Sequence, residues 1–197
     1  MGKAVPAVVL AAGASSRLGQ PKSLVCIEGV SLVALAHRRL VLAGCSPILV
    51  VTRQELSFEV MHEVPGATVV VNTEPERGRT GSLQCALQSL MADKGRIPHS
   101  VIVAPVDRPG WNASHVRSLI DAPANSTLMH NGRKGHPLIM DQTACRNVLS
   151  APTDTPLRDI VHFHPLEVSA PLLHLNIDSP SDLQLLCEHA NSLLSDG

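Results

Sequence analysis

The stretch from Val8 to Lys22 constrains the fold of this chain more than any other segment. Residues 4–10 are mostly apolar and predict a strand of the kind that is buried on both faces in a parallel sheet. Small residues follow, among them Gly13, Ser15, Ser16 and Gly19. Small residues let the backbone approach a ligand closely, and consecutive N–H groups can line an anion-binding concavity. The stretch therefore predicts a strand that leads into a phosphate-binding loop.

Two cations in this loop supply the fixed positive charge that a polyphosphate needs. Arg17 offers a planar fork of donors, and Lys22 offers a compact point charge. The spacing is not that of a P-loop, because no Gly-Lys-Ser/Thr closes the loop. It is not that of the dinucleotide-binding motif G-x-G-x-x-G either, because the second glycine is missing. From the residues alone, an ordinary solvated loop between a strand and a helix is an equal alternative.

Composition and charge narrow the classes of function. The 197 residues suffice for one domain, 1–197, with a sizeable core. A net charge of −1, one Trp, two Phe and no Tyr argue against a nucleic-acid partner. No apolar run approaches the roughly 20 residues that span a bilayer, so we expect no membrane partner. The five cysteines are scattered without a C-x-x-C pair, which favours reduced thiols in a cytoplasmic protein.

Apolar segments alternate with segments of helical pattern along the chain, which predicts an α/β fold with a doubly wound, mostly parallel sheet. After the first strand, we expect strands over 47–52, 67–71, 99–106, 127–131, 136–140 and 172–177. We expect helices over 31–43, 54–64, 83–92, 113–120 and 180–194.

Two carboxylates follow predicted strands that lie far apart in the chain. Asp107 follows strand 99–106, and Asp178 follows strand 172–177. Open α/β sheets bind ligands at the carboxyl ends of their strands. Two carboxylates together with substrate phosphates are a ligand set that Mg²⁺ prefers. Asp107 also has a simpler interpretation as a turn or cap residue. Ser179 and Asp182 form a helix-start pattern, so Asp182 is expected to cap, which leaves Asp178 available for another role.

A longer motif in this region resembles a known family. Leu10-Ala11-Ala12-Gly13-x-Ser15-x-Arg17-x-Gly19-x-Pro21-Lys22 resembles the signature of the MobA-like NTP transferases, which include the molybdenum cofactor cytidylyltransferases. The resemblance continues in order with Asp107-Arg108-Pro109, Gly135-His136-Pro137 and the segment 176–183. It implies a three-layer, Rossmann-like fold of the nucleotide-diphospho-sugar transferase type.

The resemblance also implies a role for each matching residue. Arg17 and Lys22 are then the catalytic cations that stabilise charge on the triphosphate. Asp107 and Asp178 would bind Mg²⁺, with Mn²⁺ as the alternative ion. His136 and Arg158 would bind the acceptor. The nucleotide would contact Leu10, Ala11, Ala12, Gly13, Gly81, Ser82 and Asp107.

The motif favours one branch of the family. Ala12 and Pro21 are typical of the cytidylyl branch, so the resemblance implies CTP as the nucleoside triphosphate. The implied acceptor is the phosphorylated molybdenum–molybdopterin cofactor, and a molybdoenzyme is then the implied recipient.

Two departures from the family pattern concern the acceptor. Arg108 replaces the usual Gln, and residues 153–158 lack both glycines of the usual Gly-Asp-x-Gly-x-Arg. A sugar phosphate or polyol phosphate is therefore the main alternative acceptor.

Two functions outside this activity also remain as alternatives. A non-catalytic module for nucleotide binding or cofactor delivery is the first. A dinucleotide-dependent oxidoreductase is less favoured, because it would need the missing glycine and an acid where Thr52-Arg53 stands.

Overall fold

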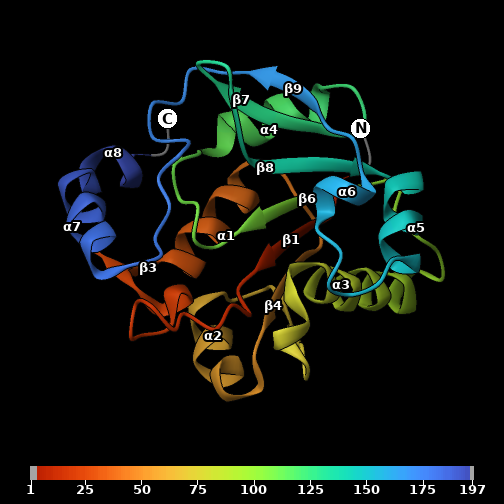
Figure 1. Cartoon of the computed structure of the whole chain (residues 1–197), viewed down its shortest axis with the longest axis horizontal. Coiled ribbons are helices and arrows are strands. Elements are labelled where there is room, and N and C mark those ends of the chain that lie inside the picture. Colours follow the sequence, from red (N-terminus) through yellow and green to blue (C-terminus); the bar gives the residue numbers. More distant parts are fainter. Residues whose placement is uncertain (1–3, 196–197) are drawn as a thin grey trace.

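The computed structural model describes residues 4–195 and is built around one seven-stranded sheet (Figure 1). The strand order is β5-β4-β1-β6-β8-β7-β9. Neighbouring strands are parallel except for β8, which runs antiparallel to both β6 and β7. The prediction of a mostly parallel α/β sheet is confirmed. The strands are β1 (Ala7–Leu10), β4 (Ile48–Thr52), β5 (Thr68–Val71), β6 (Ser100–Pro105), β7 (Ser126–His130), β8 (Arg133–Asp141) and β9 (His164–Glu167).

Helices cover both faces of the sheet and give three layers. On one face, buried side chains come from α1 (Leu32–Leu42), α2 (Ser57–Glu63), α4 (Ala113–Asp121), α7 (Pro180–Glu188) and α8 (Ala190–Leu194). On the other face they come from α3 (Gly78–Lys94) and α5 (Gln142–Ser150), with the short α6 (Leu157–Ile160) beside them. The small pair β2 (Cys26–Ile27) and β3 (Val30–Ser31) precedes α1. No helix within residues 4–195 is long and apolar enough to cross a membrane.

The central strands are apolar throughout because both of their faces are covered. In β1, Ala7 and Val9 belong to one core layer and Val8 to the other, and all three are 0% exposed. Leu10 at the end of β1 is aligned with Pro105 at the end of β6. The loop after β1 and the residues after β6 therefore leave the sheet next to each other, at the edge where open α/β sheets bind ligands.

Helix α3 begins at Gly78, five residues before the predicted start at Leu83. Its N-cap is Arg77, so neither Thr80 nor Ser82 caps it, and Gly81 and Ser82 lie inside the helix rather than in a loop. Tertiary contacts hold this first turn in place. Thr80 Oγ1 donates to the carbonyl oxygen of Thr155 at 2.6 Å, and Gly81 N–H donates to that of Thr153 at 3.2 Å.

Residues 172–174 form a turn and 175–177 have no regular secondary structure, so the predicted strand there is wrong. The segment is apolar because Leu173 and Ile177 enter the core, not because it joins the sheet. It crosses closely over Gly110, where an added Cβ would lie 1.7 Å from the carbonyl oxygen of Leu172. The Ile177 N–H donates to the carbonyl oxygen of Asp107 at 2.9 Å, which brings Asp178 to the end of β6.

The last predicted helix is divided at His189 into α7 and α8. Its start is confirmed, since Ser179 and Asp182 form a reciprocal capping box. Helix α8 lies near α1, because Arg38 of α1 donates to the carbonyl oxygen of Leu194 at 3.1 Å.

Candidate active site

The loop after β1 turns back on itself around Ser15. Ser15 has a φ of +53° and its carbonyl oxygen accepts from the N–H groups of Leu18 and Gly19. Gly19 has a φ of +74°, in the left-handed region that glycine enters at least cost. The Ser15 hydroxyl accepts from the Lys22 N–H at 3.0 Å. These bonds fix the position of Lys22, which begins a short 3₁₀ helix, Lys22–Leu24.

The ammonium group of Lys22 lies between two carboxylates. Its Nζ is 2.5 Å from Asp178 Oδ1 and 3.6 Å from Asp107 Oδ2. Arg17 contacts the other oxygen of Asp178 at 2.7 Å, but its side chain is 79% exposed, whereas that of Lys22 is 13% exposed. The hydrogen bond from Lys22, with a smaller contribution from Arg17, lowers the pKa of Asp178. The four predicted residues Arg17, Lys22, Asp107 and Asp178 thus form one charged cluster.

Sequence reasoning missed Arg79 as a member of this cluster. Its guanidinium lies 3.0 Å from Asp107 Oδ2 and comes from the first turn of α3. The signal was present, since Arg79 lies in the polar segment after β5. It was overlooked because the helix was expected to begin at Leu83, which leaves Arg79 in a loop of undefined direction.

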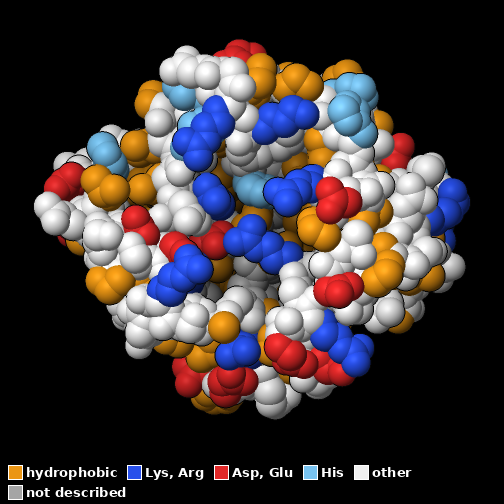
Figure 2. Space-filling view, in the orientation of Figure 1, with side chains coloured by type: hydrophobic (Ala, Val, Ile, Leu, Met, Phe, Trp, Pro, Cys, Tyr) orange, Lys and Arg blue, Asp and Glu red, His pale blue; other side chains and the backbone are white. Residues whose placement is uncertain are grey.

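Two cavities meet at this cluster. The smaller has a volume of about 420 Å³ and is lined by the loop after β1, the first turns of α3, Asp107 and Asp178. The larger has a volume of about 780 Å³ and is lined by β8, residues 153–158 and α6. Leu10, Arg79 and Pro105 line both cavities, so Arg79 stands at their boundary. Figure 2 shows Lys and Arg side chains around the central hollow of this face.

Most of the predicted nucleotide-binding residues line the smaller cavity, namely Leu10, Ala11, Ala12, Gly13, Ser82 and Asp107. Ser82 accepts from Asn72 Nδ2 at 3.0 Å and donates to the Gly78 carbonyl oxygen, so its hydroxyl is already bonded within the protein. Gly81 lines neither of these two cavities and instead packs against Thr153.

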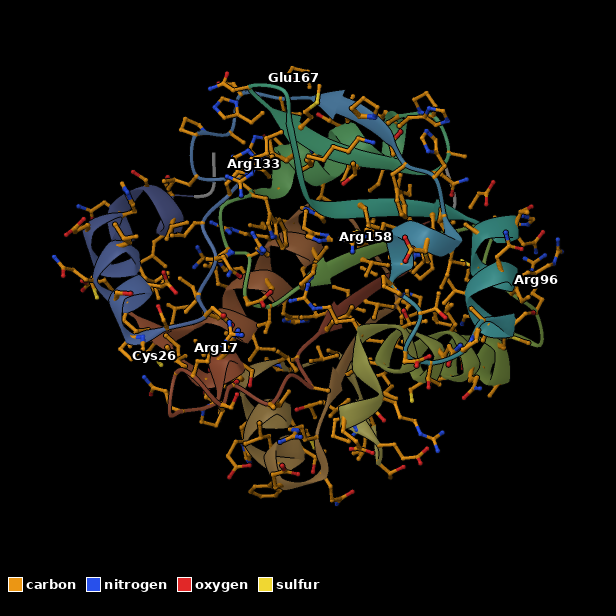
Figure 3. The ribbon with its side chains drawn as sticks, viewed as in Figure 1. Arg17, Cys26, Arg96, Arg133, Arg158 and Glu167 are labelled. Carbon is orange, nitrogen blue, oxygen red and sulfur yellow. The ribbon has the colours of Figure 1, made fainter. Side chains whose placement is uncertain are left out.

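Both predicted acceptor residues line the larger cavity. His136 lies on β8, and its Nδ1 is buried without a hydrogen-bond partner among the described residues. Burial, followed by the charges of Arg79 and Arg108, lowers the pKa of His136 to about 4. At neutral pH this imidazole is therefore uncharged, and it can orient an anion but not neutralise one. Arg158 lies on α6 and lines the same cavity as Arg133, which begins β8 (Figure 3).

The donor set at the smaller cavity fits a hard divalent cation. Asp107 Oδ1 is buried and has no hydrogen-bond partner within residues 4–195, so it is available to a ligand. Asp178 faces the same Lys22 ammonium and is partly exposed. The described residues contain no group of three His, Cys, Asp or Glu side chains suited to a metal. Two carboxylates leave coordination positions for water and substrate phosphates, as Mg²⁺ or Mn²⁺ requires.

Comparisons with known proteins agree with this geometry. The family model for the MobA-like NTP transferase domain matches residues 7–168. The molybdenum cofactor cytidylyltransferase of Escherichia coli K12 is 22% identical over 187 residues, which cover 91% of this chain and 93% of that protein. Nicotine blue oxidoreductase of Paenarthrobacter nicotinovorans is 31% identical over 149 residues, which cover 70% of this chain and 71% of that protein.

Solved structures share the fold over nearly the whole chain. The homolog of Mycobacterium tuberculosis Rv0371c from Mycobacterium sp. strain JC1 superimposes with a TM-score of 0.79 at 23% identity, covering 96% of this chain and 98% of that one. Rv0371c of M. tuberculosis H37Rv in complex with manganese superimposes with a TM-score of 0.74 at 19% identity, covering 94% of this chain and 99% of that one. The inositol-1-phosphate CTP transferase of T. maritima superimposes with a TM-score of 0.71 at 16% identity, covering 98% of this chain and 97% of that one. These likenesses confirm the predicted nucleotide-diphospho-sugar transferase type of fold.

Proposed function

Because the chain belongs to the MobA-like NTP transferase family, we propose that it transfers a cytidylyl group from CTP to a phosphorylated small molecule. The molybdenum–molybdopterin cofactor is the first candidate acceptor, a molybdoenzyme is the candidate recipient, and the cytoplasm is the proposed location. The observation that carries the proposal is the Lys22 ammonium between Asp107 and Asp178 in the smaller cavity, which meets the larger cavity at Arg79.

In this proposal the smaller cavity binds the nucleotide and the larger binds the acceptor. An oxygen of the acceptor phosphate attacks the α-phosphorus, a new P–O bond forms, and the bond to the β-phosphate breaks to release pyrophosphate. Lys22 and Arg17 bind the triphosphate oxygens, and Arg79, which lies between the cavities, binds the reacting phosphates. A divalent cation on Asp107 and Asp178 would neutralise charge on the breaking phosphoanhydride. Positioning and charge neutralisation are the main requirements of such transfers, and no protein nucleophile is needed.

The assignment of CTP as the substrate is tested by ranking the nucleoside triphosphates by how much each raises the melting temperature of the protein. A ligand that binds only the folded state raises the melting temperature, so CTP with Mg²⁺ should give a larger shift than GTP, ATP or UTP. Mn²⁺ in place of Mg²⁺ tests the choice of ion. Dominance of another nucleotide would refute the cytidylyl assignment, and no shift with any of the four would refute the enzyme assignment.

Asp107→Asn tests the metal-binding role directly. The amide keeps the shape of the side chain but weakens metal binding, so we expect pyrophosphate release to fall on the order of 10³-fold, since metal assistance is worth several kcal/mol. Asp93→Asn is the matched control, because Asp93 is exposed and lines neither of the cavities described above. Full activity of Asp107→Asn would contradict the role.

An oxidoreductase is the competing assignment, because the relative with 31% identity carries that name. Here β4 ends at Thr52 and Arg53 follows, so no acid stands at the end of the second strand to bind a dinucleotide ribose. NADPH therefore serves as a further arm of the melting experiment. A shift with NADPH that exceeds that of every nucleoside triphosphate would favour the oxidoreductase.

A further inference from the structure

The larger cavity carries an excess of positive charge. Its lining includes five cationic side chains and a single acid, Asp154. The cations are Arg79, Arg108, Arg133, Lys134 and Arg158. With Asp154 included, their net charge is about +4, so a single acceptor phosphate, which carries at most two negative charges, leaves about half of it without a counterion.

Three of these cations already have oxygen partners in the protein. Arg79 contacts Asp107, as described above, and Lys134 Nζ donates to the carbonyl oxygen of Phe163 at 2.7 Å. Arg158 lies 3.8 Å from Asp159. By contrast, Arg108 and Arg133 form no ion pair within residues 4–195.

The guanidinium group of Arg108 is partly buried and poorly hydrated. Its Nε is buried without a hydrogen-bond partner among the described residues. Arg79 and Arg133 line the same cavity as Arg108, so three guanidinium groups share one hollow. Like charges so placed repel each other, and an anion bound between them would offset the repulsion and the lost hydration. The uncharged His136, with its free Nδ1, lines the same cavity.

We propose that the acceptor carries a second anionic group, a carboxylate or a phosphate, and that Arg108 and Arg133 bind it. The proposal rests on the proposed function, since it concerns the acceptor of that reaction. The attacking phosphate lies at Arg79, where the two cavities meet, and the second anion lies in the larger cavity. Arginine suits this task because its planar fork binds carboxylate or phosphate through two parallel hydrogen bonds.

Calorimetric titrations with three small phosphate esters, at fixed ionic strength, test whether a second anion is bound and whether it is a carboxylate or a phosphate. Glycerol 3-phosphate has no second anion, 3-phosphoglycerate adds a carboxylate, and glycerol 1,3-bisphosphate adds a phosphate. We expect at least one of the last two to bind about 10-fold more tightly than glycerol 3-phosphate, as charge-assisted hydrogen bonds predict. The tighter of the two identifies the second anion. Equal binding of all three, or binding of none, would overturn the proposal.

Charge-removing variants locate the effect. In Arg133→Gln, which alters an exposed side chain, the preference for the doubly anionic probe should fall below about 3-fold. Arg108→Gln, which restores the residue usual in the family, should do the same. Arg96→Gln removes an equal charge far from Arg133 and Arg158 (Figure 3) and should keep the preference. An equal loss in Arg96→Gln would show a general charge effect and overturn the proposal.

The failure of this proposal is distinguishable from failure of the proposed function. The same preparations are melted with CTP and Mg²⁺, whose binding uses the smaller cavity. Stabilisation by CTP without any preference for a second anion would reject the second-anion site alone. Absence of stabilisation by any nucleoside triphosphate would reject the proposed function on which the site depends.

Discussion

At the scale of single residues, the charge balance of the smaller cavity depends on Lys22. Its carboxylate neighbours come from the end of β6 and from the segment before α7, so one ammonium group joins two distant parts of the chain. Lys22 is largely buried, whereas Arg17, which also contacts Asp178, is exposed. The two cations should therefore differ in their effect on stability although both are assigned to the triphosphate.

Lys22→Met should lower the free energy of unfolding by about 1–3 kcal/mol, because it leaves the buried Asp107 with one cation fewer and two carboxylates facing each other. Arg17→Met should change it by less than about 0.5 kcal/mol, because exposed ion pairs contribute little. Urea denaturation without nucleotide measures both. Equal effects of the two substitutions would contradict the assigned difference in burial.

His136 makes stability depend on pH. Its pKa is about 4 in the folded protein, against 6.5 for an unperturbed histidine. Between these values the unfolded chain binds more protons, so the free energy of unfolding decreases as the pH falls from 6.5 to 4. Burial lowers the pKa of His37 and His115 as well, which adds to the same trend.

The contribution of His136 is isolated by substitution. Between pH 6.5 and about pH 5, His136→Gln should lose on the order of 1 kcal/mol less stability than the unmodified chain. Urea unfolding at a series of pH values gives the comparison. Parallel pH profiles for the two proteins would show that His136 titrates normally in the folded state.

At the scale of elements, the sequence predicts what local patterns encode and misses what tertiary contacts decide. The apolar runs of β1, β4 and β6 and the capping box at Ser179 were predictable because their signals are local. The start of α3 was not, since four of residues 78–82 are Gly, Thr or Ser, which are weak helix formers, and the turn is held by contacts with residues 153–155. Residues 172–177 were misassigned as a strand because their apolar side chains enter the core without joining the sheet. Strand β9 was not predicted, and helix α5 was missed although its cap, Asp141, is a local signal.

The residues of the candidate site divide in the same way, into those that a local motif identifies and those that only tertiary contacts bring together. Arg17, Lys22, Asp107 and Asp178 were identified through motif resemblance, and their convergence follows from the adjacent ends of β1 and β6. Arg79 was missed because its direction depends on where α3 begins. The excess charge of the larger cavity depends on cations from four separate segments, which no local pattern brings together.

Gly110→Ala tests the close crossing that positions Asp178. The added methyl group would overlap the Leu172 carbonyl oxygen, so the segment 172–178 must move. We expect a loss of about 2–4 kcal/mol in the free energy of unfolding and a reduced rate of pyrophosphate release. Gly95 and Gly19 are unsuitable controls because of their positive φ angles. Gly13→Ala meets nothing within 4 Å and should leave stability nearly unchanged.

At the scale of the whole molecule, the segment after β9 completes both the core and the site. The family model ends at residue 168, yet Leu173, Ile177, Leu186 and Leu193 beyond it are 1% exposed or less. Arg39 joins this segment to the body of the protein, since it lies over the Trp111 ring and donates to the carbonyl oxygens of Pro109 and Leu193. Asp178 is carried by the same segment, so folding of the core and assembly of the charged cluster are one event.

A chain that ends at Val168 should therefore fail to fold cooperatively. Burial of one large aliphatic side chain contributes about 1.5–3 kcal/mol, so the loss of four such side chains rivals the roughly 5–15 kcal/mol total stability of a domain. We expect no sharp thermal transition and strong binding of a hydrophobic dye. A chain that ends at Ser195 keeps the described residues and serves as the control. Cooperative melting of the shorter chain would show that the matched region folds alone, and nucleotide binding by it would show that Asp178 is dispensable for holding the triphosphate.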